Sequence, residues 1–130
     1  MNQYTLVRPE HLNHFGHLFG GQMLKWVDEY AALAAMRDYP ACWLVTKAMD
    51  QVVFSKGVDC GAMLRFQIRK ERVGTTSVTY RVEVFGTEMN ALDEHQVFRT
   101  SITFVRLDED GLKCPLPADA PDKAMDEDDK

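Results

Sequence analysis

Residues 13–29 read NHFGHLFGGQMLKWVDE, and the rest of the predicted fold is arranged around them. A polar loop and a glycine pair run into a helical pattern that is apolar almost all round. Between residues 23 and 36 the charged side chains are Lys25, Asp28 and Glu29. A helix that is apolar on every side is typically buried, and this one is too short and too interrupted by charge to span a bilayer. We therefore expect a central helix with protein packed around it.

The helix is expected to begin at Gly20 or Gly21 and to end around Asp38, because Pro40 disfavours helical backbone at the residue before it. Alanines at positions 31, 32 and 35 form a small side that lets another backbone approach closely. Asp28 shares that side by the three-and-four spacing. A buried carboxylate is costly unless it is paired, protonated or functional, so Asp28 is a functional candidate. The alternative is a structural carboxylate bonded to loop amides near the helix start.

The chain after Pro40 has the pattern of β-strands, and a further short strand is expected at residues 4–8. The later strands are expected at residues 41–54, 62–69, 76–85 and 96–106. Apolar and polar side chains alternate along the last three, as when Leu64, Phe66 and Ile68 share one face. Such runs, separated by glycines, predict an antiparallel sheet with one face covered. One helix followed by strands is an α+β fold, and the open sheet edges favour pairing with a second subunit.

Length and charge divide the chain into two parts. The 130 residues suffice for one domain with its own core, which we expect to span residues 1–107. Residues 108–130 contain nine acidic and three basic residues, a net charge of −6, whereas residues 1–107 carry +1. The acidic, proline-containing end is expected to be a disordered tail. A nearly neutral domain without a basic stripe argues against nucleic-acid binding.

The first residues lack the basic start and apolar run of a secretory signal. The three cysteines show neither a CxxC pair nor an even framework. Reduced thiols and a cytoplasmic location are therefore expected.

Three histidines, at positions 11, 14 and 17, lie in the loop before the helix. No further cysteine, histidine or carboxylate ligand follows at the spacings of a zinc site. Solvated or hydrogen-bonded loop histidines are the favoured interpretation, and no metal is expected.

The glycine pair, Asp28 and Asn13 offer groups that can act on a carbonyl compound. Backbone N–H groups at a helix start are unpaired and lie at the positive end of the helix dipole, so they polarise a carbonyl group. Gly20 and Gly21 let the carbonyl oxygen approach, since no Cβ stands in the way. A desolvated Asp28 would activate water or attack the carbonyl directly. Asn13 can orient the water or the carbonyl group. Considered without the other residues, Asn13 is better interpreted as a turn or N-cap residue.

The run Asn13-x-x-Gly16-x-x-x-Gly20-Gly21, with Asp28 seven residues further on, resembles the motif of hotdog-fold acyl-CoA thioesterases. The resemblance is to broad-specificity bacterial acyl-CoA hydrolases and their cytosolic animal relatives, and it covers residues 4–106. Two further stretches fit in order: residues 48–54 look like the strand after the helix, and residues 72–77 (RVGTTS) look like the turn that borders bound coenzyme A. The family's proline and Gly-Asp pair after position 54 are replaced by Gly57 and Gly61-Ala62, so their roles do not carry over.

The resemblance implies a hotdog fold, in which an antiparallel sheet of about five strands wraps a long central helix. It implies an acyl-CoA thioesterase that needs no metal or other cofactor and whose catalytic residues are Asn13, Gly20, Gly21 and Asp28. Coenzyme A is expected to contact Arg72, Gly74, Thr75, Thr76 and Ser77. Nearby Arg69 and Lys70 suit its phosphates, or are simply a solvated strand end.

The resemblance also implies a homo-oligomer, either a dimer or an assembly of dimers, with sites between subunits. Asn13 of one chain is then expected to face Asp28 of another, and neither nucleic acid nor a membrane is an expected partner. The alternative is a non-catalytic hotdog module that binds acyl-CoA or an acyl carrier. It is favoured by the lack of a Ser–His–Asp set and of a cysteine in an activating charged setting.

Overall fold

The computed structural model describes residues 1–118 of the chain. Its elements in chain order are β1 (Asn2–Leu6), the 3₁₀-helix η1 (Pro9–His11), α1 (Gly20–Asp38), β2 (Trp43–Phe54), β3 (Met63–Val73), β4 (Ser77–Thr87) and β5 (His95–Leu107). The helix and the strands thus lie where the sequence predicts them. Residues 108–118 have a defined path, whereas the rest of the expected tail, residues 119–130, lies outside the described part.

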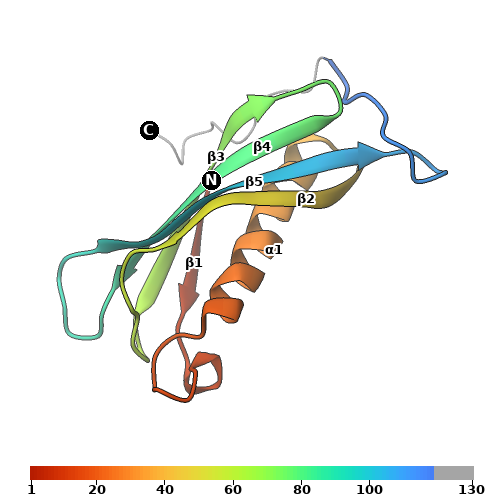
Figure 1. Cartoon of the computed structure of the whole chain (residues 1–130). Helices are drawn as coiled ribbons and strands as arrows, with labels where there is room; N and C mark the ends of the chain where they lie inside the picture. Colours follow the sequence, from red (N-terminus) through yellow and green to blue (C-terminus); the bar gives the residue numbers. More distant parts are fainter. Residues whose placement is uncertain (119–130) are drawn as a thin grey trace.

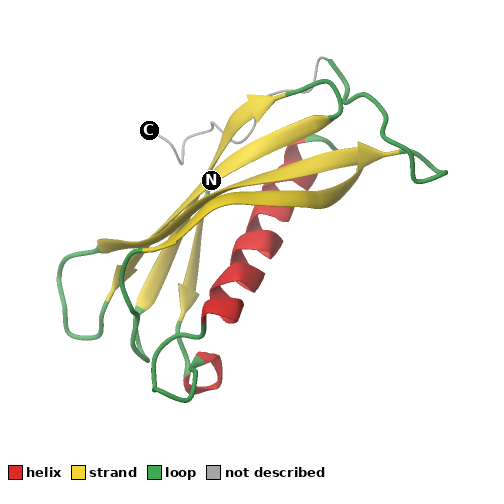
Figure 2. Ribbon diagram, viewed as in Figure 1, coloured by secondary structure: helices red, strands yellow, loops and turns green. Residues whose placement is uncertain are grey.

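The five strands form one antiparallel sheet in the order β1-β3-β4-β5-β2. Helix α1 lies across one face of this sheet, which curves around it (Figures 1 and 2). The predicted α+β architecture is confirmed. Within residues 1–118, no helix is long and apolar enough to cross a membrane.

The alternation along the strands decides which face of the sheet meets the helix. Every second side chain of the central strands is fully buried, including Leu64, Phe66, Ile68, Val78, Tyr80, Val82, Val84, Phe98 and Ile102. The helix contributes Val27, Ala31, Ala34 and Ala35, each 0% exposed. Small side chains on the helix allow the close packing that protein interiors require.

The sheet covers one side of α1, whereas the sequence predicts a helix with protein packed around it on every side. On the other side Leu33 is 50% exposed and Met36 is 59% exposed. The outer face of the sheet is polar, and there Arg65 binds Glu94 through hydrogen bonds of 2.6 and 3.3 Å. This hydrogen-bonded carboxylate raises the pKa of the Arg65 guanidinium, and the pair ties the β4–β5 loop to β3.

The fully buried acid of the helix is Asp38, not Asp28. Its Oδ2 accepts a hydrogen bond from the Tyr80 hydroxyl at 2.7 Å and lies 3.6 Å from Lys70 Nζ. The same ammonium group lies 4.9 Å from the centre of the Tyr39 ring. These contacts join the carboxyl end of α1 to β3 and β4.

We expect Tyr80→Phe to lower the free energy of unfolding by about 1–3 kcal/mol, because a buried carboxylate loses its hydroxyl donor. Urea denaturation followed by circular dichroism measures the change. Tyr4→Phe is the matched control, since it is the same chemical change at a side chain that is 55% exposed. Equal stability of Tyr80→Phe and the wild-type protein would contradict the role given to this hydrogen bond.

Candidate active site

Asp28 lies at the margin of the helix face that packs on the sheet. The centre of that face is the row of Val27, Ala31, Ala34 and Asp38, and Asp28 is one position further round the helix, by about 100°. It is therefore half-buried. The sequence predicts Asp28 at the tightest helix–sheet contact, and that prediction is wrong. Its Oδ1 accepts a hydrogen bond from the Thr46 hydroxyl at 2.6 Å. Within residues 1–118 the Asp28 carboxylate accepts no other hydrogen bond, so Oδ2 is available to a ligand.

Thr46 belongs to β2 and is a site residue that the sequence does not reveal. A threonine in a strand carries no functional signal of its own, and nothing in the local pattern points it at Asp28. The structure places it there because β2 pairs with β5 at the edge of the sheet beside the helix.

The amino end of α1 is open. The N-cap residue is Phe19, which makes no side-chain capping hydrogen bond. The first turn begins with Gln22 N–H, which donates to Phe19 O at 3.0 Å. In the described part of the chain, the N–H groups of Gly20 and Gly21 donate to no backbone acceptor. Two donors at the positive end of the helix dipole are thus left for a ligand.

Two aromatic rings flank this helix start. A Cβ on Gly21 would come within 2.6 Å of the Phe19 ring, and one on Gly20 would lie 3.4 Å from the Phe54 ring. The Phe19 and Phe54 side chains are 56% and 53% exposed. They give the open helix start apolar walls, which are suited to the hydrocarbon part of a substrate.

Asn13 holds the loop that leads into the helix. Its Oδ1 accepts hydrogen bonds from the N–H groups of Phe15, at 2.9 Å, and His17, at 3.2 Å. This is the turn role that the residue alone predicts. Its side-chain Nδ2 donates no hydrogen bond within residues 1–118 and can still bind a ligand.

One chain does not bring the four predicted catalytic residues together. Asp28 is eight residues beyond Gly20 on the same helix, which separates them by about 12 Å along the helix axis. The loop that carries Asn13 lies at the amino end of α1 (Figure 1). A single carbonyl group can therefore contact the helix start or Asp28 of the same chain, but not both.

The loop histidines have local partners. His11 Nδ1 accepts a hydrogen bond from Arg8 N–H at 2.9 Å, and its ring packs against Trp26 with 4.7 Å between ring centres. His17 Nδ1 lies 2.7 Å from Asp59 Oδ1. No group of three or more possible metal ligands occurs in residues 1–118. His11 and His17 thus have the hydrogen-bonded loop role favoured by the sequence, whereas the His14 ring packs against Phe15 with 4.0 Å between ring centres.

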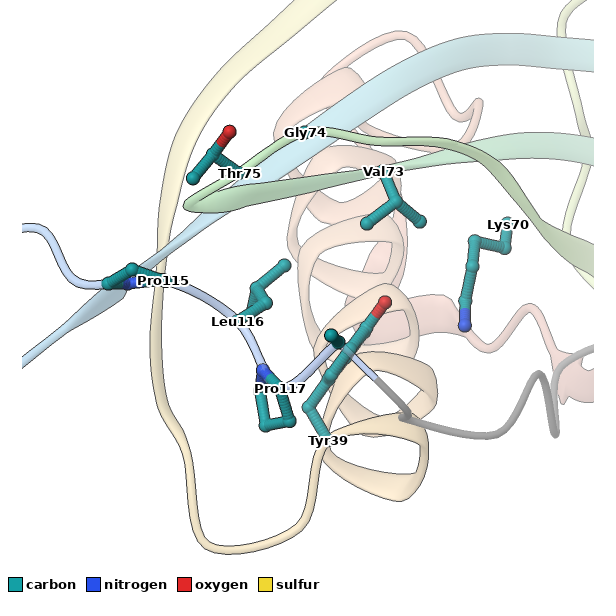
Figure 3. A pocket seen from close by; sticks show the side chains of 9 residues that line it. Tyr39, Lys70, Val73, Gly74, Thr75, Pro115, Leu116 and Pro117 are labelled. Carbon is teal, nitrogen blue, oxygen red and sulfur yellow. The ribbon is translucent and has the colours of Figure 1, made fainter.

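The residues predicted to bind coenzyme A lie on and beside the β3–β4 turn, at the carboxyl end of α1 (Figure 1). Gly74 N–H donates to Ser77 O at 2.8 Å, and a Cβ on Gly74 would lie 2.9 Å from Ser77 Oγ. Arg72 donates from Nη2 to Thr79 Oγ1 at 3.3 Å. Gly74 and Thr75 border a pocket of about 550 Å³ that also contains Lys70 (Figure 3).

Comparison with known proteins identifies the family of the chain. The profile of the thioesterase superfamily matches residues 15–91. An uncharacterized acyl-CoA thioester hydrolase of Zymomonas mobilis is 31% identical over 113 residues, which are 87% of this chain and 75% of that protein. Mouse acyl-coenzyme A thioesterase 11 is 32% identical over 77% of this chain, but the chain spans 17% of the mouse protein.

Among solved structures, a hexameric hotdog fold thioesterase of Campylobacter jejuni superposes with a TM-score of 0.78 and 30% identity, over 88% of each chain. The hotdog fold predicted from the sequence is thereby confirmed. The chain belongs to the thioesterase superfamily, and the predicted class of enzyme, a thioester hydrolase, is confirmed with it.

Gly20→Ala is expected to leave the free energy of unfolding unchanged or higher, because a helix favours alanine over glycine by up to about 1 kcal/mol. The new Cβ would be at an ordinary contact distance from Phe54. The control is Gly61→Ala, where φ is +91° and the Cβ would meet Met89; it should destabilise by roughly 1–2 kcal/mol. Urea unfolding compares the two variants. A large loss of stability at Gly20 would show that the fold itself needs glycine there.

Proposed function

We propose that this protein hydrolyses acyl-CoA to a free carboxylic acid and coenzyme A, with Asp28 as general base or nucleophile. The observation that carries the proposal is the 2.6 Å hydrogen bond from Thr46 to Asp28, which fixes one carboxylate oxygen and leaves the other available. A base or nucleophile has to be held in one orientation within reach of the reacting carbon. The three cysteines are free thiols, in keeping with a cytoplasmic enzyme.

The polarising group is the open start of α1. The N–H groups of Gly20 and Gly21 bind the thioester oxygen and stabilise the negative charge that develops on it. Water adds to the carbonyl carbon as Asp28 takes its proton. The carbon–sulfur bond then breaks, and the departing sulfur takes this proton from Asp28, so that coenzyme A leaves as a thiol. In the nucleophilic variant Asp28 itself adds to the carbon, and water cleaves the resulting anhydride.

The active site is built between two subunits. Polarising donors and base both have to lie within hydrogen-bond reach of one thioester group, and one chain keeps them about 12 Å apart along the helix axis. The glycine pair and Asn13 of one subunit therefore act with Asp28 and Thr46 of another. Asn13 Nδ2 orients the water or the thioester.

The edge strand β2 supplies the contact between the two subunits. Within residues 1–118 it pairs with β5 alone, and its side chains Trp43, Val52 and Phe54 are 40–58% exposed. A long, partly apolar edge strand is a template for pairing with another chain. Two β2 strands related by a twofold axis would continue the sheet, and three such dimers would make a hexamer like that of the Campylobacter thioesterase.

Asp28→Asn is expected to reduce turnover by about 10²-fold or more while the protein stays folded, because the amide cannot accept a proton from water. The measurement is the release of free thiol from short, long and aryl acyl-CoAs. A chelator should leave the rate of the wild-type protein unchanged. Glu29→Gln is the control, an exposed acid next to Asp28 on the same helix. Tight binding of acyl-CoA without turnover of any chain length by the wild-type protein would instead favour a non-catalytic binding module.

Mixing two inactive variants tests whether the site lies between subunits. Asn13→Ala and Asp28→Ala subunits, unfolded together and refolded, should regain roughly a quarter of the wild-type activity, because half of the randomly formed dimers contain one intact site out of two. Each variant refolded alone is the control. If the mixture is no more active than the two variants alone, Asn13 and Asp28 act within one chain.

A further inference from the structure

The chain after β5 folds back across the β3–β4 turn. Leu107 forms an isolated bridge with Lys113, and residues 114–118, which we call the strap, then pass over the turn. Leu116 N–H donates to Thr75 O at 2.9 Å, and Arg106 Nη1 donates to Pro115 O at 2.8 Å. The Leu116 side chain is 8% exposed. One hydrogen bond to the turn, one to β5 and a buried leucine thus hold the strap in place.

The strap forms one wall of the 550 Å³ pocket. Leu116 from the strap, Val73 from β3 and Tyr39 from the end of α1 point toward one another (Figure 3). Lys70 supplies a cation whose side chain is 8% exposed and is held 3.6 Å from the buried Asp38. An apolar wall beside a fixed cation suits a ligand with a flat ring and a phosphate group.

The position of the pocket along the helix identifies the part of the substrate that it takes. Tyr39 is eleven residues beyond Asp28, which is about 16 Å along the axis of α1. The pantetheine arm of coenzyme A, with its two amide units, spans roughly 15 Å when extended, like four to five residues of extended chain. A thioester that reacts at Asp28 is therefore long enough to place its nucleotide end in this pocket.

We propose that the strap is the specificity wall of the nucleotide pocket, and that Leu116 is a positioning residue for the coenzyme A end of the substrate. The Leu116 backbone holds Thr75 and the turn in place, and its side chain forms part of the pocket wall. The strap thereby favours coenzyme A thioesters over thioesters that lack the nucleotide. This inference rests on the proposed hydrolysis of acyl-CoA.

Leu116→Ala tests the proposal with two substrates that carry the same acyl group. With acyl-CoA the KM should rise about fivefold or more at nearly unchanged kcat, since a well-packed wall affects binding of the nucleotide end. With the N-acetylcysteamine thioester, which lacks the nucleotide, kcat/KM should stay within about twofold of the wild-type value. Leu112→Ala, at a side chain that is 65% exposed, is the control.

Arg106→Gln removes the hydrogen bond to Pro115 O and should give the same selective rise in KM. It replaces Leu116→Ala in the test if that variant is too unstable to assay. An unchanged KM for acyl-CoA, or an equal loss with both substrates, would overturn the role of the strap. Absence of hydrolysis of either substrate by the wild-type protein would instead refute the proposed function.

Discussion

The close approach of α1 to the inner face of the sheet is the constraint on which the other features depend. It is possible because Ala31, Ala34 and Ala35 present only methyl groups at the contact, and all three are 0% exposed. At this distance Asp28 reaches the hydroxyl of Thr46 on β2, and Asp38 reaches the hydroxyl of Tyr80 on β4. One packing interface therefore positions both the proposed catalytic carboxylate and the pocket at the far end of the helix.

The requirements of folding and of chemistry separate along the helix. At its carboxyl end, buried polar contacts join helix and sheet, and their loss would leave a carboxylate unsatisfied in the core. At its amino end, Phe19 caps nothing, and the fold leaves room for a side chain at Gly20. An uncapped helix start beside two exposed aromatic rings adds little to the stability of one chain. In the proposed mechanism this helix start binds the carbonyl oxygen of the thioester.

The sequence predicts the elements well because each depends on local pattern. Period-two alternation identified the inner face of β3, β4 and β5, and the glycine pair with Pro40 marked both ends of α1. Features that depend on register between distant segments were not predictable: Thr46 meets Asp28 through the pairing of β2 with β5, and Asp38 is buried by residues of two strands. The sequence also did not predict which helix residues form the buried row, and Asp28 lies at the margin of that helix face. The contact that we propose between Asn13 of one subunit and Asp28 of another depends on the oligomer, which no pattern within one chain describes.

The most direct measurement is a crystal structure of the oligomer with an acyl-CoA analogue in which a methylene group replaces the thioester sulfur, so that the carbonyl is kept but cannot be hydrolysed. The account predicts the carbonyl oxygen within hydrogen-bond distance of the Gly20 or Gly21 N–H of one subunit, with Asp28 of a second subunit beside the carbonyl carbon. The nucleotide end should lie against the Thr75 turn and the strap. A carbonyl group remote from both, or Asp28 and the glycine pair on separate surfaces of the oligomer, would contradict it.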